Sequence, residues 1–241
     1  MKPTNLYQIE LASVFANGRS LAIKLGYAYL LGLPFALIEM SANARVIGVI
    51  VLILFTSFFG AATTIVSRRS DGLLDRLQML PLRKRGIYLD FLLSGAIVDI
   101  LQVGVVFLLL LAVNGSSVSL NLVLGIAGMF VLSALLLNIL GMLLGTIAKG
   151  SQEVYLIGSL GIGVIGFFSG LYPVSGKIES VVDTISRFSP LRYLADTMRW
   201  SMADASVTVG SVADWQAVLS ILLIAIVVIG FSLRTFDRGA K

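Results

Sequence analysis

Long uninterrupted apolar runs constrain this chain more than any other feature of its sequence. The run IGVIVLILFTSFFGAATTIV, for example, contains no charged residue at all. An α-helix of about 20 residues crosses the hydrocarbon core of a bilayer, which is roughly 30 Å thick. Six segments are long and apolar enough, and we predict a membrane-spanning helix in each: 21–40, 46–66, 87–113, 119–148, 154–172 and 215–235.

The composition supports an integral membrane protein rather than a soluble domain. Of the 241 residues, 57% are hydrophobic and 13% are charged, whereas soluble domains carry about 25% charged residues. We therefore predict an all-α membrane protein with one transmembrane domain, residues 1–241. The chain has no Cys and no His, which excludes disulfides, His-based metal sites and Ser-His catalysis. We expect no catalytic residue, no metal site and no cofactor on this chain.

The basic residues predict how the chain is oriented. Thirteen of the 18 Lys and Arg lie in alternate connections, namely 1–20, 67–86, 149–153 and 236–241, or at the ends of adjacent spans. Lys and Arg accumulate on the cytoplasmic side of membrane proteins. We therefore expect both termini in the cytoplasm and an outer segment at 173–214. The net charge of +5 then reflects membrane orientation, and we expect no nucleic-acid partner. The mixed apolar and polar residues of 1–20 predict an interfacial helix that contacts lipid.

The cytoplasmic connection 67–86 contains a short amphipathic pattern. Asp71 can cap a helix at its N-terminus, and Pro81 disfavours helix at the residue before it. A helix at about 72–80 would place four leucines along one side: Leu73, Leu74, Leu77 and Leu80. The residue pattern leaves two interpretations open. The helix is held at the interface by anionic lipid, or it docks into a groove of a soluble partner.

Two stretches resemble a known family. GLLDRLQMLPLRKRGIYLDFLL is similar to the segment between spans two and three of permeases of the ABC transporter type-2 exporter family. The matching residues are Gly72, Leu73, Leu77, Pro81, Arg83 and Lys84. SPLRYLADTMRW is similar to the stretch before the last span of those permeases, with matches at Pro190, Leu191, Tyr193 and Arg199. The six-span layout and the large outer loop agree as well. Arg69 and Ser70 depart from the family, which commonly has acidic residues there.

The resemblance implies a transport function. In that family the helix between spans two and three is a coupling helix that fits a cleft of an ATPase subunit. Here that role would fall on Gly72, Leu73, Leu74, Leu77, Leu80 and Pro81. The chain has no G-x-x-x-x-G-K-[ST] phosphate loop, so ATP and Mg²⁺ would bind a separate ABC ATPase subunit. Two ATPases and a homodimer of permeases would form an exporter of hydrophobic or amphipathic compounds in a prokaryotic cell membrane. The alternative is a membrane assembly protein that recruits a soluble partner without transport.

Three polar side chains lie deep in the predicted spans. Asp99 is near mid-bilayer in the third span, Gln102 shares its helix face, and Asn138 lies in the fourth span. A charge at that depth costs about 2.5–3.5 kcal/mol on insertion scales, so it should face the bundle interior or water. These residues either line a substrate path or form a buried interhelical hydrogen bond, and the sequence favours neither.

Glycines predict close packing between helices. The motifs GMLLG and GFFSG have the G-x-x-x-G spacing that lets helices approach each other closely. We expect such contacts at Gly141, Gly145, Gly161, Gly166 and Gly170. The segment GIGVIG has the spacing of a dinucleotide-binding loop, but it lies inside a span without a preceding strand, so it carries no such function. In the outer segment, apolar residues at helical spacing predict two short helices, the second beginning at Pro190.

Overall fold

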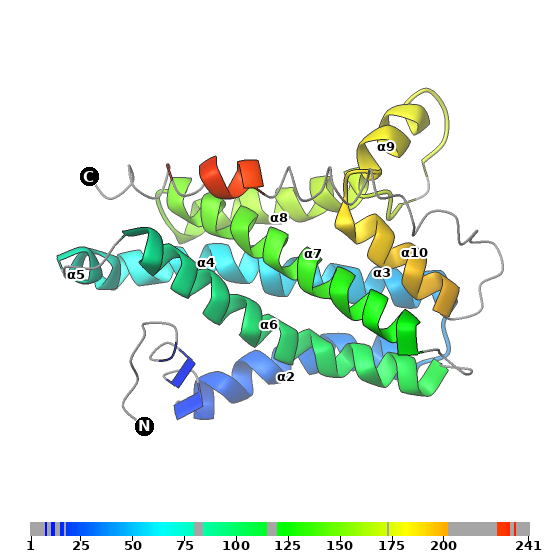
Figure 1. Cartoon of the computed structure of the whole chain (residues 1–241), viewed down its shortest axis with the longest axis horizontal. Helices are drawn as coiled ribbons and strands as arrows, with labels where there is room; N and C mark the ends of the chain where they lie inside the picture. The colour runs from blue at the N-terminus through cyan, green and yellow to red at the C-terminus, as the bar shows by residue number, and fades with distance from the viewer. Residues whose placement is uncertain are drawn as a thin grey trace.

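The structure is a computed structural model in which the described residues form a bundle of helices without strands (Figure 1). It describes residues 18–79, 84–114, 120–172, 174–201 and 226–231, and the isolated positions 8, 11, 12, 15, 16 and 234. The predicted interfacial segment 1–20 and the predicted span 215–235 lie mostly outside these residues. The elements are α2 (Gly18–Leu37), α3 (Ala42–Ile53), η1 (Leu54–Phe59), α4 (Gly60–Ser70), α5 (Leu73–Met79), α6 (Lys84–Asn114), α7 (Leu120–Ile147), α8 (Ser151–Phe168), α9 (Glu179–Ser186) and α10 (Pro190–Ser201).

Four helices in the described part of the chain are long and apolar enough to cross a membrane: Ala42–Ser70, Gly86–Leu110, Val123–Ile147 and Ser151–Phe168. They coincide with the second to fifth predicted spans, and the all-α prediction is confirmed. The first predicted span forms α2, whose apolar stretch is only Leu25–Phe35. The six-span layout as a whole stays a prediction.

The second span is one continuous rod made of three elements, α3, η1 and α4. Its middle turn, η1, is a π-helix, a widened turn that is frequent at functional sites. Thr56 in this turn donates its hydroxyl to the carbonyl oxygen of Leu52 at 3.0 Å. The rod lies at the centre of the bundle, and α7 packs against both η1 and α4.

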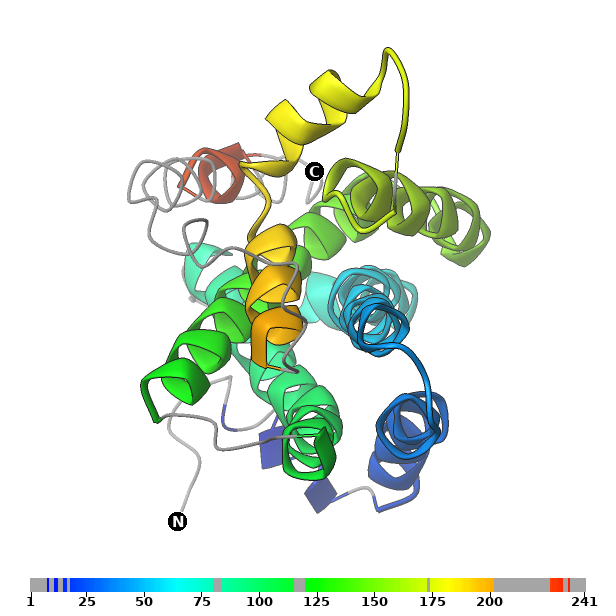
Figure 2. The same cartoon turned by 90° about the vertical axis from the view of Figure 1, so that its right-hand side faces the viewer.

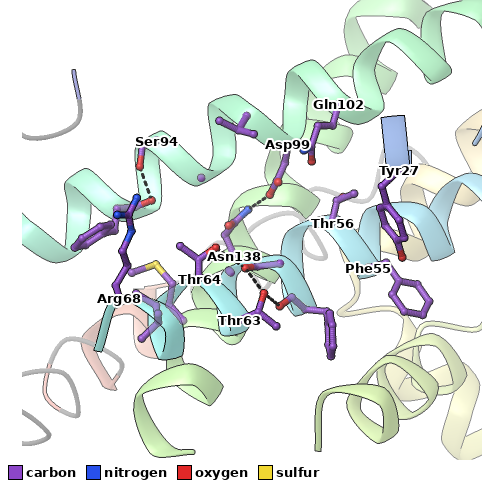
Figure 3. Close-up of a pocket in the computed structure, with 18 of the residues that line it drawn as sticks. Tyr27, Phe55, Thr56, Thr63, Thr64, Arg68, Ser94, Asp99, Gln102 and Asn138 are labelled. Atoms are coloured by element: carbon purple, nitrogen blue, oxygen red, sulfur yellow. Dashed lines mark hydrogen bonds between the residues drawn. The ribbon is translucent and has the colours of Figure 1, made fainter. Parts of the chain in front are cut away.

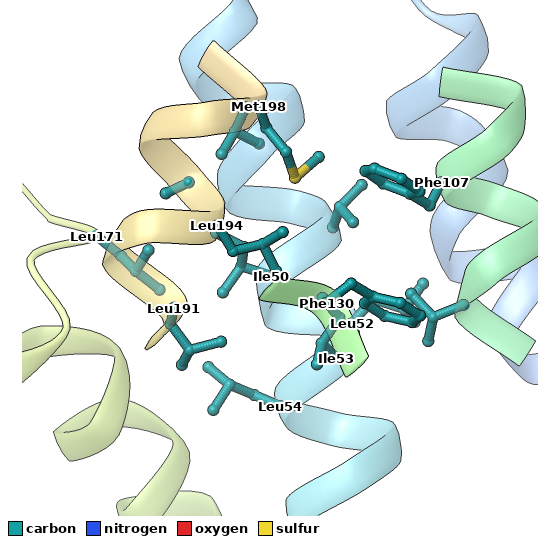
Figure 4. Packing of buried hydrophobic residues seen from close by; sticks show 14 of the residues in the cluster. Ile50, Leu52, Ile53, Leu54, Phe107, Phe130, Leu171, Leu191, Leu194 and Met198 are labelled. Carbon is teal, nitrogen blue, oxygen red and sulfur yellow. The ribbon is translucent and has the colours of Figure 1, made fainter. Parts of the chain in front are cut away.

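The main hydrophobic core joins the second span to α6, α7 and α10. Ile50, Ile53 and Leu54 of the rod meet Phe107 of α6 and Phe130 of α7, whose rings stack with centroids 6.0 Å apart (Figure 4). Leu191, Leu194 and Met198 of α10 complete this core. The outer helix α10 is therefore inserted between α3 and α7 rather than lying on the surface, as the end view shows (Figure 2).

The connection between α4 and α5 differs from the sequence expectation. Asp71 does not begin α5; it is the C-cap of α4, and its N–H donates to the carbonyl oxygen of Ser67. Gly72 follows with a φ of 67°, the left-handed conformation that often ends helices. The carbonyl of Gly72 then accepts the first hydrogen bond of α5, from the N–H of Arg76. The glycine is required here because a side chain at positive φ would be strained.

Candidate functional site

The short helix α5 lies at one end of the bundle (Figure 1), and its leucines face inward. Leu74 and Leu77 are buried in a second hydrophobic cluster with Ile65 of α4 and with Tyr88 and Phe91 of α6. Two of the four leucines of the predicted stripe, Leu74 and Leu77, are therefore covered by the chain's own helices. The docking role of the stripe stays a prediction.

The outward surface of α5 carries different residues. Met79 is 84% exposed and Arg76 is exposed as well, whereas Leu73 is only partly buried against the same cluster. Leu80 and Pro81 lie outside the described residues. The coupling role of 72–81 stays a prediction. Among the described side chains of α5, Arg76 and Met79 are the exposed ones. Met79 was not predicted from the sequence, because the amphipathic pattern of this segment was defined by leucines alone.

A cavity of about 440 Å³ lies between α2, the second span, α6 and α7 (Figure 3). Its polar lining includes the three side chains singled out in the sequence, together with residues of the other walls: Tyr27, Thr56, Arg68, Asp99, Gln102 and Asn138. The volume falls in the range of about 300–1,000 Å³ that is usual for small-molecule sites.

Asp99 and Asn138 are brought together across 39 residues of sequence. The amide nitrogen of Asn138 donates to Oδ2 of Asp99 at 2.6 Å and to the carbonyl oxygen of Ala134 at 3.0 Å. The side chains are deeply buried, with relative exposures of 7% for Asp99, 6% for Gln102 and 2% for Asn138. The two side chains thus form an interhelical hydrogen bond and also line a cavity. The sequence had left open whether they form a hydrogen bond or line a path, and in the structure they are hydrogen-bonded at a cavity wall. A substrate role for it stays a prediction.

Several hydroxyl groups in the cavity wall were missed by sequence reasoning. Ser94, Thr56, Thr63 and Thr64 line the cavity, and their signal in the sequence is weak, because threonine and serine are unremarkable in a membrane span. Thr63 and Thr64 lie about one helical turn after the end of the π-helical turn at Phe59. Only the fold shows that these hydroxyls face the same space as Asp99.

The predicted packing glycines lie at different kinds of contact. A Cβ on Gly141 would lie 2.1 Å from the carbonyl oxygen of Phe58, and one on Gly145 would lie 2.6 Å from that of Ala62. Both place α7 directly against the backbone of the second span. Gly161 of α8 faces the ring of Phe58, with a Cβ contact of 2.9 Å. The last two approach no other span as closely: Gly166 faces Tyr172, and Gly170 has a φ of 69° beside Ser186 in the outer segment.

An ionic network fastens the two outer helices to each other. Arg192 of α10 reaches Asp183 of α9 at 2.7 Å, and Arg187 reaches the other oxygen of that carboxylate at 2.9 Å. These hydrogen bonds, from Arg192 first and then Arg187, hold the pKa of Asp183 below its usual value. On α10 itself, Arg199 pairs with Asp196 at 3.0 Å and binds Asn43 at the start of α3 at 2.7 Å.

Four membrane-length apolar helices around a buried polar pair define an integral membrane protein. Comparison with protein families makes this specific, because the model of the ABC-2 type transporter family matches residues 7–203. The chain therefore belongs to the ABC-2 type transporter family, as the two sequence motifs indicated. Such domains are the transmembrane components of transporters, so this chain is a permease subunit. A comparison with curated proteins returned no match.

Proposed function

We propose that this chain is the membrane subunit of an ATP-driven exporter that moves hydrophobic or amphipathic compounds out of the cytoplasm or the inner leaflet. The observation that carries the proposal is the family match over residues 7–203, which covers the four membrane-length apolar helices and α5. The transporter would consist of a homodimer of this chain and two ABC ATPase subunits, which bind ATP and Mg²⁺. Both termini and α5 would lie in the cytoplasm of a prokaryotic cell.

The coupling surface of this proposal is the outward side of α5, whose described exposed side chains are Arg76 and Met79. Met79 offers an exposed apolar side chain and Arg76 a charge beside it, a combination that suits insertion into a groove of a soluble partner. Behind this surface, Leu74 and Leu77 pack against Tyr88 and Phe91 of α6. A push on α5 by a closing ATPase would therefore be transmitted to the third span through packed side chains.

The test is co-purification of an ABC ATPase with the tagged permease from membranes in mild detergent, identified by mass spectrometry. We expect Met79→Asp to reduce the recovered ATPase about tenfold or more, because a hydrated carboxylate would replace the apolar side chain that enters the interface and would have to be desolvated there. The matched control is Ile178→Asp. It places the same charge on a 57% exposed apolar residue next to α9, at the other end of the bundle, and should leave the ATPase bound.

Two results would contradict the proposal. One is the absence of any ABC ATPase from the purified wild-type complex. The other is equal recovery of the ATPase with Met79→Asp and with wild type, which would remove α5 from the contact. The family match favours transport over the alternative of a non-transporting assembly protein. ATP-dependent efflux from vesicles containing the complex, measured against the Met79→Asp variant, separates the two.

A further inference from the structure

We propose that the cavity between α2, the second span, α6 and α7 binds an uncharged aromatic compound that carries an amide group, and that the side-chain amide of Gln102 is its hydrogen-bonding partner. The binding is a property of this chain alone. Only the further role of such a compound as the exported substrate rests on the proposed function.

The hydroxyl groups of the cavity wall are already hydrogen-bonded. Each of four hydroxyls donates to a carbonyl oxygen of its own helix, at 2.8–3.1 Å: Ser94, Thr56, Thr63 and Thr64. A hydroxyl has a single proton, so these groups have no donor left for a guest. A guest that accepts hydrogen bonds must therefore find its donor elsewhere in the wall.

The two charged residues of the wall are engaged as well. Asp99 accepts a hydrogen bond from Nδ2 of Asn138 at 2.6 Å and makes a further interaction within the protein. Arg68 also interacts within the protein. An ion that leaves water without gaining a partner is strongly disfavoured. The wall therefore favours an uncharged guest, which leaves these existing interactions intact.

Gln102 is the exception among the buried polar residues of the wall. It is 6% exposed and lines the cavity, yet its amide has no hydrogen-bond partner among the described residues. A buried polar group without a partner is costly, so a guest that pairs with it gains affinity. A primary amide offers two N–H donors and an acceptor oxygen without charge. The group that complements both sides of it is another primary amide.

Aromatic rings line the cavity as well. Phe55 and Phe59 of the π-helical turn and Tyr27 of α2 belong to the wall. Figure 3 shows Gln102 toward the end of the cavity where Tyr27 and Phe55 lie, with Arg68 at the opposite end. Rings favour offset-stacked or edge-to-face contacts with other rings. An aromatic body joined to the amide would therefore be bound at this end of the cavity.

The cavity opens sideways. Ile23 and Tyr27 of α2 and Thr64 of α4 belong to its lining and are exposed. The mouth thus lies between α2 and α4, on the side of the bundle. An uncharged aromatic compound enters hydrocarbon far more readily than an ion does, so it can reach this mouth from within the membrane.

The experiment measures binding to the full chain, purified from membranes into lipid nanodiscs. The probes are tritiated 2-naphthamide and tritiated 2-isopropylnaphthalene, in which two methyl groups replace the oxygen and nitrogen of the amide. Binding to empty nanodiscs is subtracted, and each affinity is expressed relative to the concentration of the compound in the lipid. We expect saturable binding, with the amide bound about tenfold more tightly, because it can form two hydrogen bonds with Gln102.

The first variant is Gln102→Leu, which removes the amide but keeps a side chain of similar size. It should abolish the preference for 2-naphthamide and leave the affinity for 2-isopropylnaphthalene nearly unchanged. A merely structural role of Gln102 would instead change the affinity for both compounds to the same extent.

The second variant fills the cavity. Gly60 lines it, and an added Cβ would meet only the carbonyl oxygen of Phe55, at 3.8 Å. Gly60→Leu should therefore extend into the cavity and weaken the binding of both compounds several-fold. The matched control is Gly163→Leu on α8, which lies outside the cavity wall and where an added Cβ meets nothing within 4 Å. This control should bind both compounds as wild type does.

Four results would overturn the proposal. Two concern wild type alone: the absence of saturable binding of 2-naphthamide, and equal affinity for the two compounds. The others are a preference for the amide that survives in Gln102→Leu, and equal affinities of Gly60→Leu and Gly163→Leu. The first two results need no variant, so misfolding of a variant cannot mask them.

The outcome is distinguishable from that of the proposed function. If an ABC ATPase co-purifies but 2-naphthamide does not bind preferentially, the inference about the cavity fails and the exporter stands. If 2-naphthamide binds through Gln102 but no ATPase associates, the exporter fails and the binding site stands.

Discussion

Replacing Gly141 by Ala should destabilise the bundle, because α7 touches the second span through its backbone at this point. A Cβ on residue 141 would lie 2.1 Å from the carbonyl oxygen of Phe58, 2.9 Å from its carbonyl carbon and 3.0 Å from the Cβ of Ala61. The obstacle is mainly main chain, which cannot rotate away as a side chain can. To restore ordinary contact, α7 would have to move by roughly 1 Å in a close-packed interior.

The expected cost follows from that geometry. Inserting a methyl group into a well-packed contact costs typically about 1–3 kcal/mol, and the better helix propensity of Ala returns up to about 1 kcal/mol. For a chain of this size, each kcal/mol lowers the midpoint of thermal unfolding by about 2–4 °C. We expect a net decrease of several degrees for Gly141→Ala. Gly145→Ala should show a smaller one, because its Cβ would lie 2.6 Å from the carbonyl oxygen of Ala62.

The assay is thermal unfolding of the purified protein in detergent, followed by circular dichroism at 222 nm. The matched control is Gly128→Ala on the same helix, where an added Cβ meets nothing within 4 Å; this variant should be as stable as wild type or slightly more so. The reasoning is refuted if Gly141→Ala and Gly128→Ala unfold at the same temperature.

Two further predictions concern charged groups at the two ends of the bundle. Arg69 donates to the carbonyl oxygens of Thr146, at 3.3 Å, and Ala148 at the end of α7. Arg69→Gln should therefore lower the free energy of unfolding by about 1–2 kcal/mol. Its unfolding midpoint should lie below that of the control Arg76→Gln, which alters an exposed side chain. Asp183 has a lowered pKa because Arg192 and Arg187 bind its charged form. The carboxylate therefore contributes fully to stability at a pH above its ordinary pKa of 3.8, and this contribution disappears as the pH falls through the lowered pKa. Asp183→Asn should lower the unfolding midpoint more at pH 7 than at pH 2, and an equal effect at both values would contradict the assignment.

The spans could be predicted from the sequence because hydrocarbon imposes a simple rule on length and polarity. The four long apolar helices Ala42–Ser70, Gly86–Leu110, Val123–Ile147 and Ser151–Phe168 lie where hydropathy put them. The family could be recognised for a related reason, since the pattern around α5 and α10 is a local string of residues. The polar residues Asp99 and Asn138 could be singled out individually, because each is expensive in a membrane.

The features that could not be predicted from the sequence depend on how each helix is rotated about its axis and on where it begins and ends. Whether Leu77 faces outward or inward depends on how α5 folds back on α6, and no local pattern determines that contact. Asp71 is a good N-cap by residue type, yet it ends α4, because Gly72 takes the left-handed conformation one residue later. The π-helical turn at Leu54–Phe59 has no distinctive composition, so its effect on which side chains reach the cavity was not predictable.

The surface of α5 and the cavity beside Asp99 share the same three helices. Leu74 and Leu77 hold α5 against α6, and Arg69 binds the end of α4 to the end of α7. The cavity is walled by Thr64 of α4, Asp99 of α6 and Asn138 of α7, in addition to α2. A displacement of α5 cannot tilt α4 or α6 without changing the distances between those walls. Because the Asn138–Asp99 hydrogen bond spans α6 and α7, it would be among the first contacts strained. In an exporter built this way, a push from the ATPase on α5 would change the shape of the cavity through the helices that α5 contacts.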